Sequence, residues 1–249
     1  MKRKLQALIV FLLLGIAKLP LEQHTVAALR DHEMLYQPLD YQARDAVGQV
    51  GFAAALGGLR SLVASVTYLM GFTAFEEVNW PRVDFLYNIT TQLQPRFDVY
   101  WKDAAEHMAY DAASNYRYDE SRPRLYREQL YRQYVQRGID ILKDGLRFLP
   151  HNDRLHATLA DLYSRRKEPP DHELAGRHYL LAYQNGGLPV NARLAAYEWA
   201  QLDNAPERWR AAYQILRDSY ARGLHMPGLV NFLHMLENKL NVPPMQRAR

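Results

Sequence analysis

Residues 101–108 read Trp101-Lys-Asp-Ala-Ala-Glu-His-Met108, and Gly138, Leu142, Gly145 and Pro150 follow further along the chain. Small residues recur where two antiparallel helices approach closely, and large residues recur where side chains fill the groove between them. Ala104 and Ala105 supply the small positions of the first helix, and the two glycines supply those of the second. This spacing predicts a packed helix hairpin.

The same skeleton recurs elsewhere in the chain. It appears as Leu159, Ala160 and Tyr163 followed by Ala175, Tyr179 and Ala182, and more loosely as Met70, Gly71 and Ala74 followed by Val83, Tyr87, Thr90 and Pro95. Recurrence of one supersecondary unit is the sequence signature of a stacked array of helices. Alternating β-branched runs are scarce and apolar residues mostly recur at three and four positions, so we expect an all-α solenoid.

One hairpin is longer than the others. The prolines that close two successive units, Pro95 and Pro150, are 150 − 95 = 55 residues apart. This is about 21 more than the roughly 34 residues of one such unit. The excess lies near residues 114–130, and it predicts an insertion that lengthens the hairpin.

The pattern resembles the tetratricopeptide repeat (TPR), with Trp101 and Tyr163 at the positions of the Trp and Tyr on its first helix. Four stretches extend the resemblance: Ala55-Leu-Gly-Gly-Leu-Arg-Ser-Leu-Val-Ala64, Ile89-Thr-Thr-Gln-Leu-Gln-Pro-Arg-Phe97, His107-Met-Ala-Tyr-Asp111 and Arg137-Gly-Ile-Asp-Ile-Leu-Lys-Asp-Gly145. Over residues 56–182 the chain is therefore similar to a family of membrane-anchored bacterial TPR-like proteins of unassigned function. The resemblance implies a TPR-like fold and membrane anchoring, and it brings no catalytic residue.

The rest of the chain extends this architecture. Residues 190–203 and 206–221 predict a further hairpin, because Pro189 and Pro206 lie where helices start. Residues 227–240 are amphipathic and predict a capping helix, which the end of a helical array needs. We expect a TPR-like repeat domain of about four hairpins over residues 55–240, followed by a basic tail over residues 241–249.

The N-terminus carries a signal for export or anchoring. The basic stretch Lys2-Arg-Lys4 precedes an apolar run over residues 5–17. This run is shorter than the roughly 20 residues of a spanning helix and is typical of a signal peptide, with Gly15 and Ala17 as small residues at a cleavage spacing. The family resemblance favours a retained anchor instead. Either way the basic flank stays cytoplasmic and the body is exported.

We expect a signal anchor or signal peptide at residues 1–22, with membrane contact through residues 5–21, and a stalk or linker at residues 23–54. A retained anchor places the repeat domain on the periplasmic side of the inner membrane, and cleavage gives a secreted or periplasmic protein. A second apolar zone covers residues 47–75. Arg60 and several glycines in this zone favour a buried first repeat helix over a second span.

Composition and motifs narrow the function classes. The chain has 249 residues, of which 48% are hydrophobic and 23% charged, and this balance is that of a folded domain. The lack of cysteine excludes disulfides and thiolate chemistry. The sequence holds no zinc-protease histidine pair, phosphate-binding loop, nucleophile elbow or dinucleotide glycine pattern. We therefore expect no cofactor, no metal and no catalytic residue.

Four residues of the types that bind metal ions lie close together near the start of one predicted repeat helix. They are Asp171, His172, Glu173 and His178. We interpret Asp171 as the cap of that helix and its neighbours as exposed turn residues, because an aspartate before a helix satisfies backbone N–H groups. His151 and His156 are five residues apart and do not share a helix face. We expect both histidines to be solvated.

The densest aromatic and basic cluster lies in the insertion. We predict a partner-binding surface formed by Tyr116, Arg117, Tyr118, Arg124, Tyr126, Arg127 and Arg132. Tyr and Arg dominate protein interfaces because both bury a large area and Arg keeps several donors. Alternatively, the tyrosines pack between helices and the arginines pair with the acidic residues Asp119, Glu120 and Glu128. Stacking on nucleic acid is a further use of such residues, but export removes that partner. We place further groove contacts on the first helices, at Lys102, His156, Arg165 and Arg166.

These observations predict an exported, membrane-tethered scaffold that mediates protein–protein interactions or the assembly of a cell-envelope complex. Its partners would be other envelope or membrane proteins. One alternative is a helical enzyme acting on an envelope polymer, with Glu76 or Glu106 as its acid in a closed pocket. Another is a stoichiometric subunit of a membrane complex, which the 17 Tyr and 4 Trp would suit. We expect a scaffold and not an enzyme, because stacked repeats present an open groove.

Overall fold

The computed structural model describes residues 58–248, and every regular element in this range is helical. The predicted all-α fold is thus confirmed for the described part of the chain. The predicted anchor at residues 1–22 and linker at residues 23–54 lie outside the described residues. Within residues 58–248, no helix combines the length and the hydropathy that crossing a bilayer requires.

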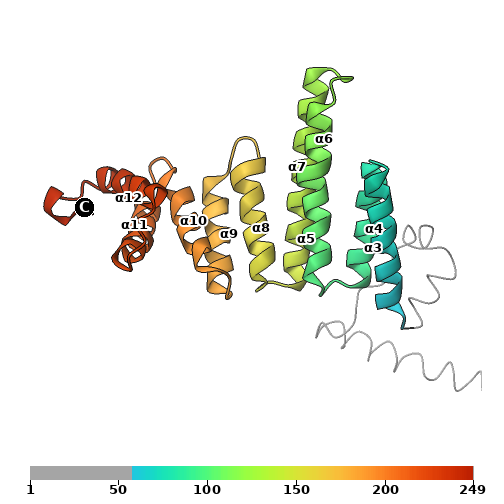
Figure 1. Cartoon of the computed structure of the whole chain (residues 1–249), viewed down its shortest axis with the longest axis horizontal. Helices are drawn as coiled ribbons and strands as arrows, with labels where there is room; N and C mark the ends of the chain where they lie inside the picture. The colour runs from blue at the N-terminus through green and yellow to red at the C-terminus, as the bar shows by residue number, and fades with distance from the viewer. Residues whose placement is uncertain (1–57, 249) are drawn as a thin grey trace, which may run out of the picture.

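The helices stand side by side in one row, and the successive arms of its hairpins run antiparallel (Figure 1). The row contains α3 (Arg60–Glu76), α4 (Trp80–Leu93), α5 (Asp98–Glu106), α6 (Ala113–Tyr118), α7 (Arg124–Phe148), α8 (Asp153–Asp161), α9 (His172–Gln184), α10 (Pro189–Ala200), α11 (Pro206–Ala221) and α12 (Pro227–Lys239). Two π-helical segments, η1 (His107–Ala112) and η2 (Leu162–Arg166), continue α5 and α8, and a short 3-10 helix, η3 (Pro244–Gln246), follows α12. Helices α5 and α6 form one arm that is continuous through η1. Each helix packs mainly on its neighbours in the chain.

The hairpin of α5, η1, α6 and α7 is longer than its neighbours and rises above the row (Figure 1). Helix α7 has 25 residues and is therefore about 37 Å long, whereas α9 has 13 residues and is about 20 Å long. The residues of the predicted insertion extend α6 and the start of α7, and they form the connection between the two helices. We call residues 116–127 the hairpin tip.

Close helix packing accounts for the glycines of α7. A Cβ atom on Gly138 would lie 2.7 Å from the carbonyl oxygen of Ala105. A Cβ atom on Gly145 would lie 2.8 Å from the ring of Trp101. Because a Cβ atom at either position would clash, α7 can approach α5 this closely only with glycine at positions 138 and 145. The close approach that the sequence predicted is confirmed.

Local sequence signals set the ends of several helices. The Asp171 side chain accepts a hydrogen bond from the Leu174 amide, which confirms its predicted role as a cap. Pro189 and Pro206 lie in the first turns of α10 and α11, as predicted. At the end of the row, α12 buries Leu229, Leu233 and Leu236 completely against α10 and α11, and so covers their apolar side chains.

Candidate partner-binding surface

The hairpin tip exposes large apolar and aromatic side chains. Tyr118 at the end of α6 is 76% exposed, and Leu125 at the start of α7 is 80% exposed. Tyr126 is 45% exposed, and the adjacent Arg124 side chain is 83% exposed. Tyr, Arg and apolar side chains in this state lose most water when a partner covers them, which is the property of an interface anchor.

The helical periodicity of α7 explains why Leu125 faces solvent. Helix α7 buries Tyr131, Val135 and Ile139, which follow one another at intervals of four residues. Leu125 instead precedes Gln129 and Arg132 by four and seven residues, and both of those positions are exposed. A leucine on the solvated face of a helix is a signal that could have been found in the sequence, and our prediction omitted it.

The arginines at the end of the tip make local ion pairs and remain at the surface. Arg124 Nε lies 2.9 Å from Glu128 Oε1, and Arg122 Nε lies 2.6 Å from Asp119 Oδ2. The hydrogen bond from Arg124 lowers the pKa of the Glu128 carboxyl below its usual value. These pairs are solvated, so they orient the side chains more than they stabilise the fold. Arg132 is exposed on the same helix.

Other residues of the predicted surface pack within the molecule. Tyr116 stacks on Tyr134 with ring centroids 5.0 Å apart, and burial raises the pKa of the Tyr134 hydroxyl. The Arg117 guanidinium lies 4.1 Å from the centroid of the Tyr131 ring. Arg127 Nη1 donates to the carbonyl oxygen of Arg117 at 3.4 Å. The alternative of internal packing therefore describes Tyr116, Arg117 and Arg127 better than the alternative of a free surface.

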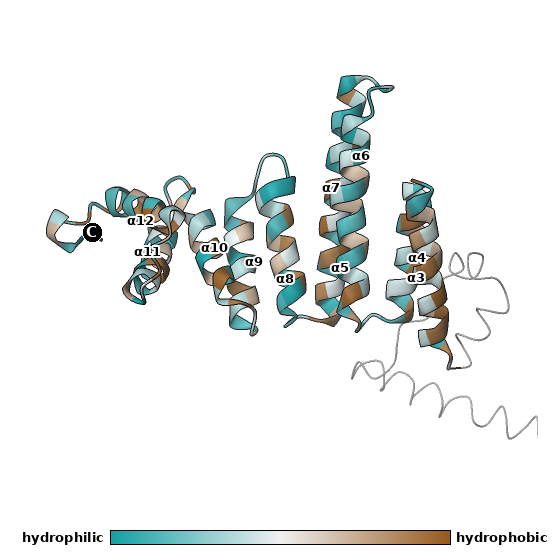
Figure 2. Cartoon of the chain, in the orientation of Figure 1, coloured by the Kyte–Doolittle hydropathy of each residue, from teal (hydrophilic) through white to brown (hydrophobic). Residues whose placement is uncertain are grey.

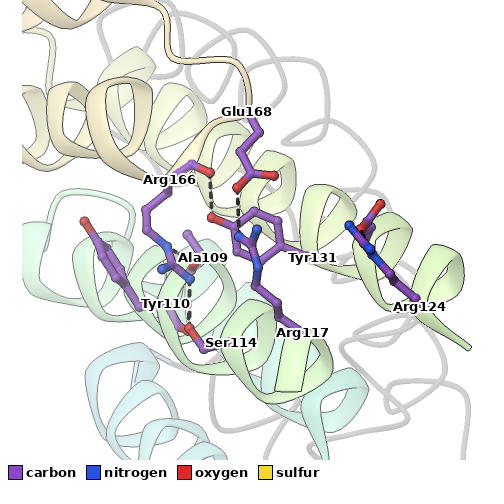
Figure 3. A network of polar contacts seen from close by, with 9 residues as sticks. Ala109, Tyr110, Ser114, Arg117, Arg124, Tyr131, Arg166 and Glu168 are labelled. Atoms are coloured by element: carbon purple, nitrogen blue, oxygen red, sulfur yellow. Dashed lines mark hydrogen bonds and ion pairs between the residues drawn. The ribbon is translucent and has the colours of Figure 1, made fainter. Parts of the chain in front are cut away.

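Arg117 also connects its hairpin to the next one. Its Nη1 lies 2.8 Å from Oε1 of Glu168, which belongs to the connection between η2 and α9 (Figure 3). The two residues are 51 positions apart in the chain. The hydrogen bond to Glu168 raises the pKa of the guanidinium. This ion pair braces the long hairpin against the following hairpin at the start of the tip.

Arg166 lies at the centre of a network that joins η2 to η1 (Figure 3). Its Nε donates to the Ala109 carbonyl oxygen at 3.0 Å, and its Nη2 donates to Ser114 Oγ at 2.9 Å. Its guanidinium lies 4.9 Å from the Tyr110 ring centroid, and its own carbonyl accepts a 2.8 Å hydrogen bond from the Tyr131 hydroxyl. Arg166 thus joins two hairpins. The N–H donors that our prediction assigned to a partner protein already have acceptors within the molecule.

The other predicted groove contacts lie apart from the tip. Lys102 on α5 pairs with Glu106 at 2.6 Å, and Arg165 on η2 pairs with Asp161 at 3.3 Å. Both pairs are accessible to solvent. His156 differs from these residues because it is only 6% exposed. The prediction that His156 is solvated is wrong, and a buried side chain offers no surface contact.

His156 is buried because it meets His178 on the neighbouring helix α9. Its Nε2 lies 3.0 Å from the Pro150 carbonyl oxygen, so Nε2 carries a proton and donates it. Its Nδ1, 3.0 Å from Nδ1 of His178, then accepts a hydrogen bond from that ring. Burial lowers the pKa of His178 to about 4 and also lowers the pKa of His156. Both rings are therefore neutral at pH 7.

The carboxylates considered for an enzyme are solvated. Glu76 is exposed at the end of α3, and Glu106 is paired with a lysine at the surface. Sequence reasoning missed a better enclosed carboxylate, Glu198, which is 7% exposed. Glu198 accepts from Ser164 Oγ at 2.7 Å and contacts His172 Nδ1 at 2.7 Å. Here the carboxylate separates the serine from the histidine, so the histidine cannot take the serine proton as a catalytic base would.

The four potential metal ligands near the start of α9 have separate partners. Among residues 58–248, no group of three or more histidine, aspartate or glutamate side chains lies in a position to hold a metal ion. Asp171 caps α9, His172 contacts Glu198, and Glu173 pairs with Arg208. His178 points instead to His156. The structure therefore divides the four potential ligands among different partners.

Comparisons with known proteins add no assignment. No protein-family model, no curated protein and no solved structure matches the chain.

Proposed function

We propose that this protein is a membrane-tethered scaffold with a TPR-like fold, and that its hairpin tip binds another envelope or membrane protein. The row of antiparallel hairpins supports both the TPR-like fold and the scaffold role, because stacked helical repeats form extended surfaces that bind other proteins. The basic and apolar N-terminal sequence supports tethering at the inner membrane with the body on the periplasmic side.

The exposure of the tip is the observation that carries the proposal. Tyr118 and Leu125 are among its most exposed side chains, and the tip stands clear of the neighbouring helices (Figure 1). Exposed apolar side chains do not stabilise the fold, and they contribute favourable free energy only when a partner covers them. The contacts of Arg117, at the start of the tip, and of Arg166, just below it, join the long hairpin to the next one, so the tip is presented in a fixed direction.

The experiment compares proteins retained by the full-length chain in mild detergent extracts of its native membranes, identified by mass spectrometry. The tip variant carries Tyr118→Ala and Leu125→Ala, and the matched control carries Gln133→Ala and Gln136→Ala on the exposed face of α7 nearer the row. We expect a discrete set of envelope proteins with the native chain and the control. The tip variant should lose these proteins, because interface anchors of this kind contribute about 2 kcal/mol or more each.

Circular dichroism checks that both variants keep native helicity. Retention of the same proteins by the folded tip variant would show that another surface binds them. Recovery of the chain alone in all three forms would remove the scaffold proposal and would make a screen for hydrolysis of envelope polymers the next step.

A further inference from the structure

Helix α3 presents an apolar face that no described helix covers. It packs on α4 through Val63, Ala64 and Thr67, and it ends the row on that side (Figure 1). The outer face of α3 consists of Leu62, Val66, Leu69 and Phe72, which are 59%, 48%, 64% and 50% exposed. Figure 2 shows hydrophobic residues recurring along this terminal helix. A contiguous apolar face of this kind marks an interaction site.

The polar groups on the outer face of α3 are already satisfied. From residue 61 to residue 75 the sequence contains no Asp, Glu, Lys or Arg. Ser65 Oγ donates to the Ser61 carbonyl oxygen at 3.0 Å, and Thr73 Oγ1 donates to the Leu69 carbonyl oxygen at 3.3 Å. Because both hydroxyls have acceptors within the helix, covering this face leaves neither of them without a partner.

The two ends of the row differ in their covering. At the C-terminal end, Leu229, Leu233 and Leu236 of α12 are fully buried against α10 and α11. At the N-terminal end, no described residue covers α3 in the way that α12 covers α10 and α11. Helical arrays need a terminal element whose inner face is apolar, since an uncovered end exposes core-like surface.

The chain itself delivers an apolar segment to this end. Gly58 has a φ angle of +96°, a left-handed conformation that turns the backbone just before α3 begins. The ten residues before Gly57 read Val47-Gly-Gln-Val-Gly-Phe-Ala-Ala-Ala-Leu56 and include no charge. Whatever precedes α3 must therefore start beside the end of its outer face.

We propose that residues 47–56 dock on the outer face of α3, antiparallel to it, and complete the row at its N-terminal end. Length agrees with this assignment. A ten-residue helical segment is about 15 Å long, and when it is antiparallel to α3 across the turn it lies beside residues 60–69, where it covers Leu62, Val66 and Leu69 of the outer face. Gly48, Gly51 and Ala54 give the segment small side chains, which permit the close approach already seen between α5 and α7.

Covalent linkage favours this occupant over a second copy or a lipid surface. Only three residues, Gly57, Gly58 and Leu59, separate the segment from the start of α3. A short flexible link holds two surfaces at an effective concentration on the order of millimolar, and a separate molecule has to compete with it. In the register that we propose for the segment and α3, Ala54 lies opposite Leu62 and Val50 lies opposite Val66.

Cysteine cross-linking tests this register in the full-length chain, which has no cysteine of its own. The matched variant carries Val50→Cys and Val66→Cys, and a second matched variant carries Ala54→Cys and Leu62→Cys. The control carries Val50→Cys and Glu76→Cys, in which the second cysteine lies ten residues further along α3, about 15 Å away. We expect intramolecular disulfides to form at least about tenfold faster in the matched variants, because docking fixes the register.

Each other result would overturn the proposal. Equal rates in matched and control variants would show an undocked segment, and a covalent dimer would assign the face to a second copy. Labelling of a Leu69→Cys variant with a water-soluble maleimide distinguishes the remaining cases if no disulfide forms. Protection only with vesicles of phosphatidylethanolamine and phosphatidylglycerol would assign the face to a bilayer, and no protection would leave it uncovered. Native helicity of every variant is checked by circular dichroism.

Discussion

Single residues without a side chain set the distance between the helices of the long hairpin. The Gly138 backbone lies against the Ala105 carbonyl and the Ala109 side chain, and neither is the flexible end of a long side chain. A methyl group added there has no space unless α5 and α7 separate. The close packing of α5 and α7 at this point therefore requires glycine, the residue without a Cβ atom.

We expect Gly138→Ala to destabilise the protein by about 1–3 kcal/mol, because overpacking of a tight helix contact forces the backbones apart. The measurement is urea unfolding followed by circular dichroism. The control is Gly228→Ala in α12, where no atom lies within 4 Å of the added Cβ. The control should be neutral or more stable by up to about 1 kcal/mol, since alanine favours a helix over glycine. Equal midpoints for the two variants would contradict the packing argument.

The same residues show how far sequence reasoning reaches. Gly138 and Gly145 were predictable because close approach between helices recurs at a fixed spacing, and Asp171 was predictable because capping is local. The burial of His156 was not predictable from its own helix, since its partner is 22 residues away on α9. The tip surface was predicted in part, because spacing identifies the cluster but not which arginine finds an acceptor in another hairpin.

At the level of single helices, α8 and α9 are joined by a contact between two titratable histidines. His156 and His178 share one hydrogen bond, and their rings also stack at 5.2 Å. The neighbouring charges are Arg177 on α9 and Lys143 on α7, and both lower the pKa of His178 further. A proton added to either ring would meet burial and positive charge, and a proton on Nδ1 of His156 would also remove the acceptor of the shared bond.

We expect the stability of the protein to fall as the pH drops from about 6.5 to about 4. The pKa of His178 is lowered to about 4 in the folded protein, and an unfolded histidine has a pKa near 6.5. Between these values the unfolded chain binds more protons, so acid favours unfolding, and the full contribution is present above pH 6.5. The loss from His178 is at most about 3 kcal/mol.

Thermal melts at pH 7, 6, 5 and 4 measure this dependence. The comparison is with His178→Gln, which keeps a side-chain donor toward His156 and cannot titrate in this range. The variant should show a shallower fall in Tm than the native protein over the same pH steps. Identical slopes would mean that other groups cause the acid loss.

At the scale of the whole molecule, stability accumulates between neighbours. Each helix packs on the elements next to it, and the apolar side chains gather in separate clusters along the row. The cluster of α10, α11 and α12 contains Trp199, Leu216 and Leu233, whereas Trp101, Met108 and Leu142 belong to the cluster around α5 and α7. In such an array the loss of one end is felt most by the adjoining helices.

We expect a chain that ends at Met226 to lose amide protection in α10 and α11 while keeping it in α4 and α7. Removal of α12 uncovers Leu216 and Ala212, which are fully buried in the intact protein. Hydrogen exchange with mass spectrometry measures protection in each helix. The control ends at Val242 and keeps the apolar contacts of α12. Uniform loss of protection along the whole chain would show that the row unfolds as one unit.

The height of the long hairpin has a consequence for how this protein can change. The side chains at its end contribute little to the core, because Tyr118, Arg124 and Leu125 lie largely in solvent. Their substitution therefore leaves the folding of the row intact, and new residues there can alter recognition without a compensating change elsewhere. Under the proposed function, a change of partner requires new side chains only at these exposed positions, whereas Tyr116, Arg117 and Arg127, which pack within the molecule, stay unchanged.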